Sequence, residues 1–305
     1  MYYFIVNPNA RSGLGKSIWF QIEPILKDAH VEYQVLFTKY RNHATKITRS
    51  LTSDSQTHTI IVLGGDGTVN EVINGISDLD KVILGYIPAG SSNDFARGFH
   101  LPTNPESALQ NILHPVRIRQ MDVGILKDQK ESRRFAVSTG LGFDAAICHL
   151  AMVSKLKVFL NKIHLGKLTY IGIALHQLLF CRPVKMTLTI DQQCSLTFDK
   201  VYFTAVMNHP YEGGGFQFCP NARTDDGLLD IIVVSDLPKW KILLLFPTAY
   251  RGMHTHFKGI HIFQGRKILL DSRQSLSVHT DGEPLGLQQH VEITTSNKQL
   301  RIISL

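Results

Sequence analysis

Short apolar runs alternate with amphipathic helical patterns over residues 1–121 of the chain. The runs YYFIV, VEYQVLFT, TIIVL and KVILGYIPA have the length and β-branched content of buried strands. Between them, apolar residues recur at helical spacing, as Ile18, Ile22 and Ile25 do after the first run. Strands that alternate with helices predict a doubly wound, mostly parallel α/β domain.

The pattern changes at residue 122. Segments such as VKMTLTI, KVYFTAVMN, LLDIIVV and HVEITTS alternate apolar and polar residues, which is typical of half-buried strands. Two helical patterns interrupt them, at residues 145–180 and 239–252. We therefore expect a second domain over residues 122–286, built as an antiparallel β-sandwich.

Each predicted strand of the first domain is followed by a glycine-rich or polar segment. NPNARSG follows the first strand, GGDGT the third and GSSND the fourth. Open α/β sheets bind ligands at the carboxyl ends of their strands, so these segments should converge on one crevice.

The segment GGDGT, residues 64–68, joins a strand to a helix and suits phosphate. Glycines let backbone N–H groups approach a ligand closely, and the start of a helix adds partial positive charge. Asp66 would offer a hard oxygen ligand to the Mg²⁺ that accompanies a polyphosphate. A structural explanation competes, because Thr68 and Glu71 have the spacing of a capping box.

Two further segments of the first domain have weaker signals. ARSGLGKS, residues 10–17, resembles a loosened Walker phosphate loop, but it does not begin directly at the end of the strand. It can still contact phosphate through Arg11 or Lys16. In GSSNDFARGF, Ser91 is a candidate helix cap and Asp94 would lie in the first helical turn.

The second domain carries two acidic segments with competing explanations. TDDGLLD, residues 224–230, gathers acids as a cation-binding loop would, yet Asp226 and Gly227 also suit a β-turn. HTDGEPLG, residues 279–286, has the Asp-Gly step of a hairpin, and the adjacent Glu283 is a candidate general base.

The net charge of +7 and the pI near 9.2 point to anionic partners. Nucleic acid is disfavoured because the sequence has no basic run interleaved with aromatic residues. The stretch 155–180 is a basic amphipathic pattern that either packs on its own domain or contacts an anionic membrane. Four scattered cysteines predict buried free thiols in the cytosol, and the first residues do not resemble a secretory leader.

The motifs occur together in one order, and as a set they carry a resemblance. NPNARSG, GGDGTVNEV, PAGSSNDFAR, GLGFDA, GGGFQFCPNARTDDGLLD and TDGEP are similar to those of the bacterial diacylglycerol kinases and their relatives, the sphingosine and ceramide kinases. The likeness spans nearly the whole chain. It implies an ATP-binding α/β domain that the C-terminal residues 287–305 return to complete.

The resemblance also implies roles for individual residues. Asp66 and Asp94 would lie near the catalytic Mg²⁺, and Glu283 would take the proton from the lipid hydroxyl, with Asp66 as the second catalytic residue. A second, structural Mg²⁺ would bind the side chain of Asp226 and the backbone carbonyls of Arg223 and Leu228. The ATP site would comprise Asn7, Pro8, Asn9, Ala10, Arg11, Thr38, Gly64, Gly65, Asp66, Gly67, Thr68, Val69, Asn70 and Ser91. Ser91 stands where the family usually has Thr, and it keeps the hydroxyl.

We therefore expect an ATP-dependent lipid kinase, with diacylglycerol as the favoured acceptor and phosphatidic acid as its product. The sequence leaves other lipids open, namely sphingoid bases and phosphatidylglycerol. It also leaves open an NAD kinase-like enzyme and a non-catalytic lipid or nucleotide sensor. The expected setting is cytoplasmic with peripheral contact to an anionic membrane, and the resemblance suggests a homodimer.

Overall fold

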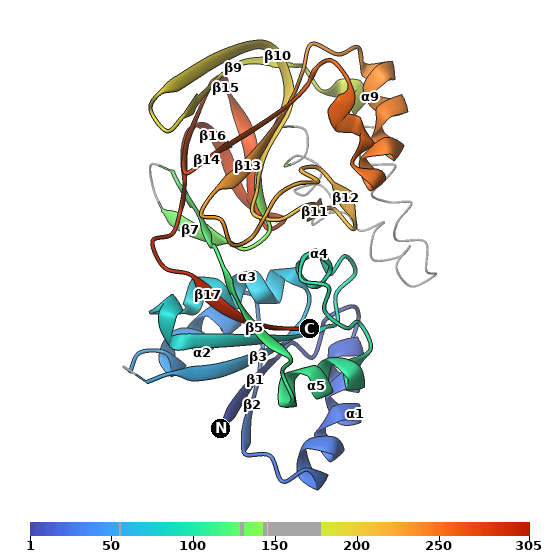
Figure 1. Cartoon of the computed structure of the whole chain (residues 1–305), viewed down its shortest axis with the longest axis vertical. Helices are drawn as coiled ribbons and strands as arrows, with labels where there is room; N and C mark the ends of the chain where they lie inside the picture. Colours follow the sequence, from blue (N-terminus) through green and yellow to red (C-terminus); the bar gives the residue numbers. More distant parts are fainter. Residues whose placement is uncertain (55, 129–130, 143–144, 146–177) are drawn as a thin grey trace.

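The computed structural model describes the chain except for residues 55, 129–130, 143–144 and 146–177. Two bodies are stacked along the long axis, each built around its own β-sheet (Figure 1). The lower body holds both ends of the chain, and the upper body is formed by the middle of the sequence. The predicted class, a parallel α/β domain followed by an antiparallel β-rich domain, is confirmed.

Within the described residues, the first sheet has six strands in the order β2-β1-β3-β4-β17-β5. All neighbouring pairs are parallel except β17 with β5. The strands are β1 (Tyr2–Val6), β2 (Tyr33–Phe37), β3 (His58–Gly64), β4 (Val82–Pro88), β5 (Arg117–Met121) and β17 (Leu300–Ser304). Each of the first four coincides with a predicted apolar run.

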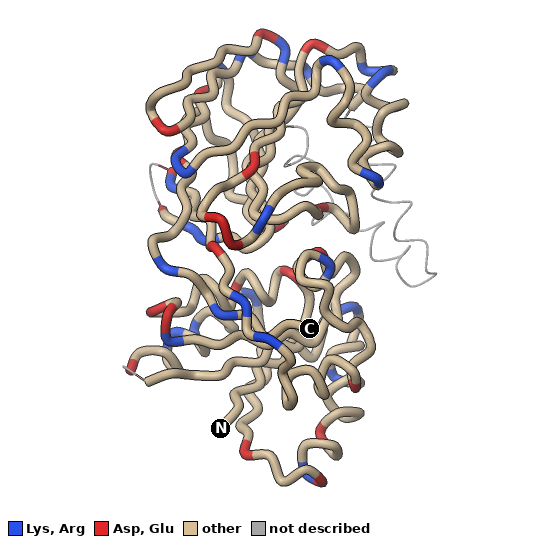
Figure 2. Tube along the Cα trace, viewed as in Figure 1, with Lys and Arg blue, Asp and Glu red and all other residues tan. Residues whose placement is uncertain are grey.

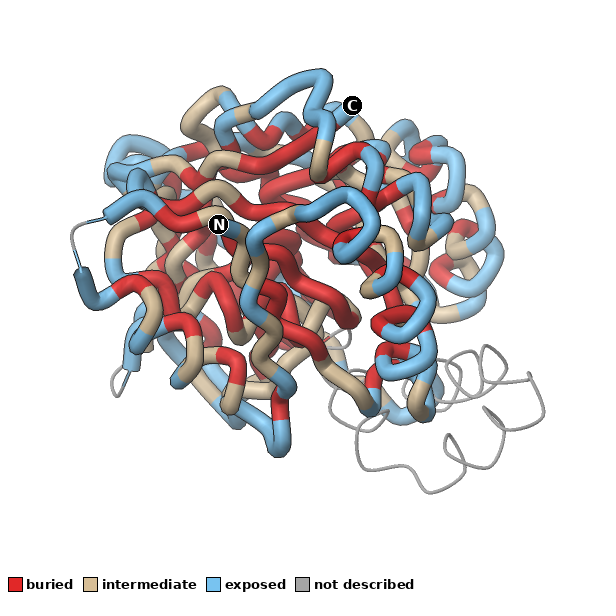
Figure 3. The backbone as a smooth tube through the Cα atoms, turned by 90° about the horizontal axis from the view of Figure 1, so that it is seen from below, coloured by how far each residue is buried: buried red, intermediate tan, exposed pale blue. Residues whose placement is uncertain are grey.

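Helices cover both faces of this sheet. Those on one face are α1 (Leu14–Asp28) and α5 (Pro105–Leu113). Those on the other are α2 (His43–Leu51), α3 (Asp66–Gly75) and α4 (Asp94–Gly98), and η1 (Leu79–Lys81) precedes β4. Alternate strand residues face opposite layers: Phe4 packs with Trp19 of α1, whereas Ile5 packs with Val72 of α3. Figure 3, viewed along the long axis, shows the buried residues between the exposed outer elements.

The second sheet is antiparallel, with nine strands in the described part of the chain. Its path is β14-β13-β10-β8-β15-β16-β6-β7, and β9 pairs with both β10 and β15. The strands are β6 (Gly124–Lys127), β7 (Ser132–Phe135), β8 (Ser138–Gly142), β9 (Val184–Ile190), β10 (Cys194–Met207), β13 (Leu229–Ser235), β14 (Ile260–Gly265), β15 (Lys267–Thr280) and β16 (Glu283–Thr295). A separate ribbon pairs β11 (Tyr211–Glu212) with β12 (Phe216–Gln217).

One helical segment of the second domain begins with α9 (Lys239–Leu245) and continues as η2 (Phe246–Arg251) and η3 (Met253–His256). It covers the predicted helical pattern at 239–252. The other predicted helix, at 145–180, lies almost wholly outside the described residues, as does Cys148.

The C-terminal stretch 287–305 is divided between the two sheets. Residues up to Thr295 belong to β16 of the second sheet, and β17 enters the first sheet between β4 and β5. The chain therefore leaves the first domain after Met121 and returns to it at Leu300.

The capping box expected at Thr68 and Glu71 is wrong. Helix α3 begins earlier, at Asp66, and its N-cap residue Gly65 has no side chain to cap it. The Glu71 carboxylate instead accepts hydrogen bonds from the backbone N–H groups of Asn42 (2.7 Å) and Ala44 (3.1 Å). It thus satisfies free N–H groups at the start of α2, a neighbouring helix.

Two smaller expectations are also settled. Ser91 does not cap α4, because Asn93 occupies the N-cap position of that helix. Of the described cysteines, Cys219 is buried, Cys181 is half-buried and Cys194 is exposed, so the expectation of uniformly buried thiols is wrong. Among the described helices, none has the length and apolarity to span a bilayer.

Candidate active site

Two glycine-rich loops cross at the carboxyl ends of β3 and β4. A Cβ on Gly65 would lie 3.1 Å from the Cα of Gly90, and one on Gly90 would lie 2.7 Å from the Cα of Gly65. A Cβ on Gly64 would lie 2.6 Å from the Thr68 hydroxyl. Close packing therefore favours glycine at positions 64, 65 and 90 before any ligand is considered.

Asp66 stands where these loops meet, as the first residue of α3. Its carboxylate oxygens accept hydrogen bonds from the backbone N–H groups of Asp94 and Phe95, each at 3.2 Å. These two groups open α4, so Asp66 occupies the positive end of that short helix. Asp66 and Asp94, both expected near a metal, are thus adjacent.

Asp94 connects this point to the second domain. Its Oδ2 accepts a hydrogen bond from the N–H of Gly214 at 2.8 Å. Gly213, Gly214 and Gly215 all have positive φ angles (64°, 88° and 112°), a conformation that favours glycine. The other oxygen, Oδ1, is buried without a hydrogen bond, and its nearest cation is the Arg97 Nε at 3.7 Å.

The pKa values of these acids are raised in this setting. Burial, and then the neighbouring Asp94 carboxylate, raise the pKa of Asp66 to about 7 against the two hydrogen bonds that lower it. Burial also raises the pKa of Asp94. Two adjacent carboxylates with raised pKa values and a buried oxygen lacking a donor suit a divalent cation, which would stabilise both in the ionised form.

The described residues contain no group of three or more His, Cys, Asp or Glu side chains that would hold a metal by themselves. Mg²⁺ does not require such a group, because it is commonly held by one or two carboxylates together with water and substrate phosphates. Asp66 and Asp94 therefore fit a magnesium ion that arrives with a nucleotide.

Most of the expected ATP-site residues lie around the same strand ends. The Asn7 side-chain amide donates a hydrogen bond to the Thr68 hydroxyl (3.1 Å), which joins the β1 loop to the start of α3. Thr38 follows β2 and is held by its N–H, which donates to the Val6 carbonyl at 2.8 Å. Arg11 and Ser91 are exposed at this edge. Pro8, Asn9 and Ala10 complete the β1 loop, and Gly67 follows Asp66.

Val69 and Asn70, also expected in the ATP site, point into the protein. Val69 is buried in the apolar core beneath α3. The Asn70 amide is fully buried and donates a hydrogen bond to Asp281 at 2.7 Å. Asn70 therefore joins the first domain to the second.

Glu283 reaches this site from the second domain. It begins β16, directly after the turn formed by Asp281 and Gly282, which have φ angles of 48° and 79°. Two positive φ angles between paired strands define the predicted two-residue hairpin. A Cβ on Gly67 would lie 3.1 Å from the Glu283 Oε1, so this carboxylate lies against the GGDGT backbone.

Arg41 binds the other oxygen of Glu283. Its Nη2 lies 2.5 Å from the Glu283 Oε2, and the Arg41 side chain is more than half exposed. No sequence pattern indicated this arginine, because it lies in the loop between β2 and α2 and belongs to none of the motifs. Arg41 belongs to the first domain and places a positive charge next to the Glu283 carboxylate.

Asp281 has a structural role that the sequence analysis did not predict. Besides Asn70, its carboxylate accepts hydrogen bonds from the backbone N–H groups of Ala136 (2.9 Å), Val137 (2.8 Å) and Ser138 (3.0 Å). Burial raises the pKa of Asp281, while these four donors lower it. The Asp-Gly step indicated the turn, but not that the aspartate would anchor it.

His279 and Glu212 support the same hairpin. The His279 Nε2 lies 3.3 Å from the Glu212 Oε1, and both residues are buried. The Gly282 N–H donates to the His279 Nδ1 at 3.1 Å, so the proton of a neutral ring is on Nε2, facing Glu212. Glu212 directly precedes the glycine loop that contacts Asp94, and His279 contacts the turn before Glu283. The pair of His279 and Glu212 therefore connects the loop beside Asp94 to the hairpin that carries Glu283.

The second acidic segment, TDDGLLD, lies apart from these residues, where the chain enters β13. The Asp226 Oδ1 accepts a hydrogen bond from the Leu228 N–H (3.0 Å), and the Asp122 Oδ2 accepts one from the Gly227 N–H (2.7 Å). Burial raises the pKa of Asp230 to about 6, and its Oδ2 is buried without a hydrogen bond. The loop is a turn with Gly227 at φ 74°, and its oxygens also suit a cation.

This geometry defines the class of the protein. It has a two-domain kinase fold, with acids at the carboxyl ends of the strands of its first sheet. The diacylglycerol kinase catalytic domain matches residues 1–126, and the YegS C-terminal NAD kinase beta sandwich-like domain matches residues 137–304. The chain belongs to the diacylglycerol kinase family of lipid kinases.

Individual relatives agree with this assignment. The chain is 30% identical over 306 residues to the lipid kinase YtlR of Bacillus subtilis, a provisional name, covering 99% of this chain and 98% of YtlR. It is 28% identical to a diacylglycerol kinase of Staphylococcus saprophyticus, covering 96% and 94% of the two chains. A crystal structure from Bacillus anthracis, provisionally named a diacylglycerol kinase, superposes with a TM-score of 0.77 at 26% identity, covering 100% and 96%.

An NAD kinase from Archaeoglobus fulgidus, solved with ATP, shares the fold at a TM-score of 0.53 and 13% identity, covering 100% of this chain and 94% of that one. The two folds are therefore related in architecture.

Proposed function

We propose that this protein transfers the γ-phosphate of ATP to the primary hydroxyl of a lipid, with diacylglycerol as the favoured acceptor and phosphatidic acid as the product. The observation that carries the proposal is the position of Glu283. Its carboxylate lies against Gly67, in the same glycine loop whose Asp66 is adjacent to Asp94. Glu283 thus lies close to the adjacent Asp66 and Asp94, as a proton acceptor beside two metal-binding acids would.

The first domain, residues 1–121 together with part of 287–305, would bind ATP. Backbone N–H groups of the β1 loop and of GGDGT would hold the phosphates, with Arg11 as an exposed counter-charge. Asp66 and Asp94 would hold Mg²⁺, which neutralises charge on the transferred group when it is bound.

Glu283 would accept the proton of the attacking lipid hydroxyl. A general base must lie within hydrogen-bond reach of that hydroxyl and be held in orientation. The contact with Arg41 fixes one carboxylate oxygen and leaves Oε1, on the Gly67 side, for the acceptor. The acceptor lipid would come from the side of the second domain, residues 122–286.

The loop at residues 223–230 would hold a second, structural Mg²⁺. Asp226 would provide a side-chain oxygen, and Arg223 and Leu228 would provide backbone carbonyls. The buried and unpartnered oxygen of the nearby Asp230, and its raised pKa, support a cation here.

We further propose a cytoplasmic protein that contacts an anionic membrane, because a kinase of insoluble lipids must reach them in a bilayer. The net charge of +7 supports the anionic character of that surface. The homodimer that the family resemblance suggests stays a prediction.

The decisive test is labelled phosphate transfer from ATP to diacylglycerol, sphingosine, phosphatidylglycerol and, as a soluble control, NAD. We expect diacylglycerol to be phosphorylated and NAD not to be. Transfer to NAD alone, or to no acceptor despite ATP binding, would contradict the proposal and favour the NAD kinase-like or sensor alternative.

Two variants test the assigned residues. Glu283→Ala should bind ATP normally and lose at least ~100-fold in transfer, as expected for removal of a general base. Asp66→Ala should lose activity with every lipid. Glu292→Ala is the matched control, because Glu292 lies on the same strand as Glu283 and pairs with Lys267 far from the site. Normal turnover by Glu283→Ala would show that another group takes the proton.

A further inference from the structure

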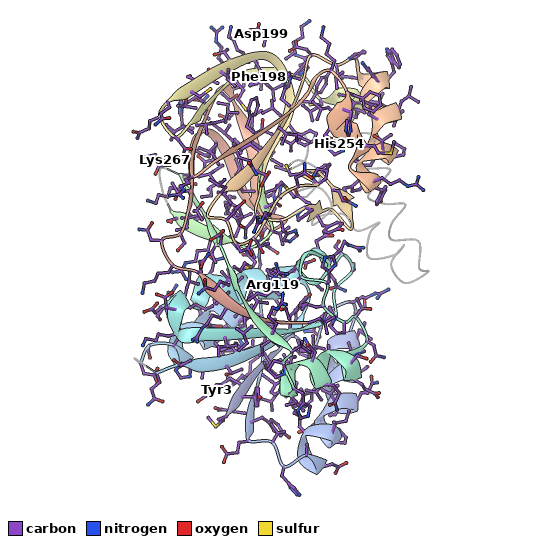
Figure 4. The ribbon with its side chains drawn as sticks, viewed as in Figure 1. Tyr3, Arg119, Phe198, Asp199, His254 and Lys267 are labelled. Atoms are coloured by element: carbon purple, nitrogen blue, oxygen red, sulfur yellow. The ribbon has the colours of Figure 1, made fainter. Side chains whose placement is uncertain are left out.

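The helical segment of the second domain, α9 to η3, has apolar side chains on two faces. On its inner face, Ile242, Leu245 and Ala249 are buried against the β-sheet, together with Phe203 and Ile232. A small cavity of about 40 Å³ lies among these side chains. Figure 4 labels His254, which lies buried at this inner side and whose Nε2 is 3.1 Å from the Phe218 carbonyl.

The outer face of α9 is also apolar, but nothing in the described structure covers it. Trp240 is 65% exposed, Leu243 is 47% exposed and Leu244 is 66% exposed. Their spacing of three and four residues places them on one side of the helix. A helix of a soluble protein normally turns polar residues to solvent, so an apolar outer face indicates a contact with something else.

The apolar surface continues onto neighbouring segments. The Lys239 Nζ donates a hydrogen bond to the Leu179 carbonyl at 2.6 Å, which places Leu179 and Phe180 beside the start of α9. Leu179 is 68% exposed and Phe180 is 71% exposed. Met253, in η3, is also exposed. We call these residues the α9 face: Leu179, Phe180, Trp240, Leu243, Leu244 and Met253.

The charged side chains along α9 and the turns that follow it have a single sign. The sequence contains no aspartate or glutamate between Asp236 and Asp271, whereas Lys239, Lys241, Arg251 and Lys258 fall within that stretch. Figure 2 shows blue and no red along α9 and the turns that follow it. Long basic side chains beside exposed apolar ones can place their charges at lipid headgroups while the apolar groups enter the acyl region.

We propose that the α9 face docks this protein on an anionic bilayer, with Trp240 and Leu244 inserted among the lipids. The inference rests on the proposed function, because it supplies the surface through which a lipid kinase reaches its substrate. A bilayer fits better than an acidic protein, since the apolar groups protrude on a convex helix and tryptophan is favoured at the membrane–water interface.

Vesicle flotation tests the apolar part of the proposal. The wild-type protein should float with phosphatidylcholine vesicles that contain phosphatidylglycerol, and Trp240→Gln/Leu244→Gln should bind them at least ~10-fold more weakly. Phe20→Gln is the matched control, because Phe20 is 60% exposed on α1 of the first domain. Equal flotation of the wild type and the double variant would overturn the proposal, as would no flotation of the wild type.

The charged part has its own test. Arg251→Gln/Lys258→Gln should weaken binding to the phosphatidylglycerol vesicles roughly tenfold and leave the weak binding to pure phosphatidylcholine unchanged. Arg49→Gln/Lys81→Gln removes two exposed charges from the first domain and should change neither. If both double variants lose binding equally, the attraction belongs to the whole protein rather than to the α9 face, and the proposal is wrong.

Activity separates this proposal from the proposed function. The Trp240→Gln/Leu244→Gln variant should phosphorylate monomeric short-chain diacylglycerol at the wild-type rate and lose turnover only with vesicles. If the wild type phosphorylates no lipid while the variant still fails to float, the docking surface stands and the proposed reaction fails. Loss of turnover with the monomeric lipid as well would show that the α9 face belongs to the active site instead.

Discussion

Glu283 Oε1 lies against the backbone of Gly67, where an added Cβ would come within 3.1 Å of it. The two residues belong to different domains, and the contact brings the hairpin of the second domain onto the glycine loop of the first. A side chain at position 67 would therefore have to displace the carboxylate or move the hairpin.

Gly67→Ala should consequently lower turnover about tenfold, because a shift of under 1 Å in a proton acceptor is enough to weaken catalysis. The φ angle of Gly67 is not positive, so alanine fits the backbone and the fold should persist. Steady-state kinetics with ATP and diacylglycerol, together with thermal denaturation, check this. An unchanged rate would mean that the position of Glu283 does not matter for transfer.

Asp281→Asn should destabilise the protein by about 2–4 kcal/mol, because an amide has one acceptor oxygen for the four donors that the carboxylate satisfies. Urea unfolding measures the change. Asp271→Asn is a suitable control, since Asp271 lies on β15, the strand that leads into this turn, and its side chain is about half exposed. A similar small change in both variants would show that the buried network contributes little.

Asp66→Asn should stabilise the ligand-free protein at high pH. The folded-state pKa of about 7 is above the unfolded value of 3.8, so the contribution of Asp66 to stability is fully present below pH 4 and is lost as pH rises toward 7. Asparagine does not titrate. The variant should therefore gain about 3 kcal/mol over the wild type between pH 5 and pH 8, as measured by urea unfolding.

Magnesium and ATP should reverse this order. They should raise the melting temperature of the wild type at pH 8, because a cation stabilises the ionised pair of Asp66 and Asp94, and raise that of Asp66→Asn much less. Chelation with EDTA should remove the difference. Equal stabilisation of the two proteins by magnesium and ATP would argue against a metal at Asp66.

His209 should make the protein acid-sensitive. Burial lowers its pKa to about 3, below the unfolded value of 6.5, so its contribution to stability is present above pH 6.5 and is lost as pH falls toward 3. Between pH 6.5 and pH 5 the loss should be about 2 kcal/mol. His209→Gln, which keeps a hydrogen-bond acceptor for the Tyr211 N–H, should lack this loss in urea unfolding at the two pH values. A pH-independent difference between the two proteins would contradict the argument.

The strands of the first domain and the hairpin that carries Glu283 follow directly from local sequence. Apolar runs bounded by glycine and polar residues mark β1 to β4, and the Asp-Gly step marks the turn between β15 and β16. The motifs also indicated Asp66, Asp94 and Glu283 as candidate site residues. The adjacency of Asp66 and Asp94 could be expected because parallel strands present their carboxyl ends on one edge, whereas Glu283 comes from an antiparallel hairpin of the second domain.

What the sequence did not reveal depends on contacts between distant segments. Glu71 has the local spacing of a capping residue for its own helix, but the nearest free N–H groups belong to α2. Arg41 has no distinguishing neighbours in sequence, and the Asp-Gly step marks Asp281 only as a turn residue, so each acquires its role only when the two domains come together. The sequence of β16 likewise resembles that of the other strands. Its pairing with β15 and β6 determines that it joins the second sheet.

The place of β17 has a consequence for how the protein forms in the cell. Leu300–Ser304 fill the gap between β4 and β5, so the sheet that carries the glycine-rich loops stays open until those residues leave the ribosome. The first 121 residues emerge early but have no partner for the exposed edge of β4. The sheet of residues 1–121 therefore becomes complete only when this much later strand is made, and a nascent chain stalled before residue 300 should remain sensitive to proteases over those residues.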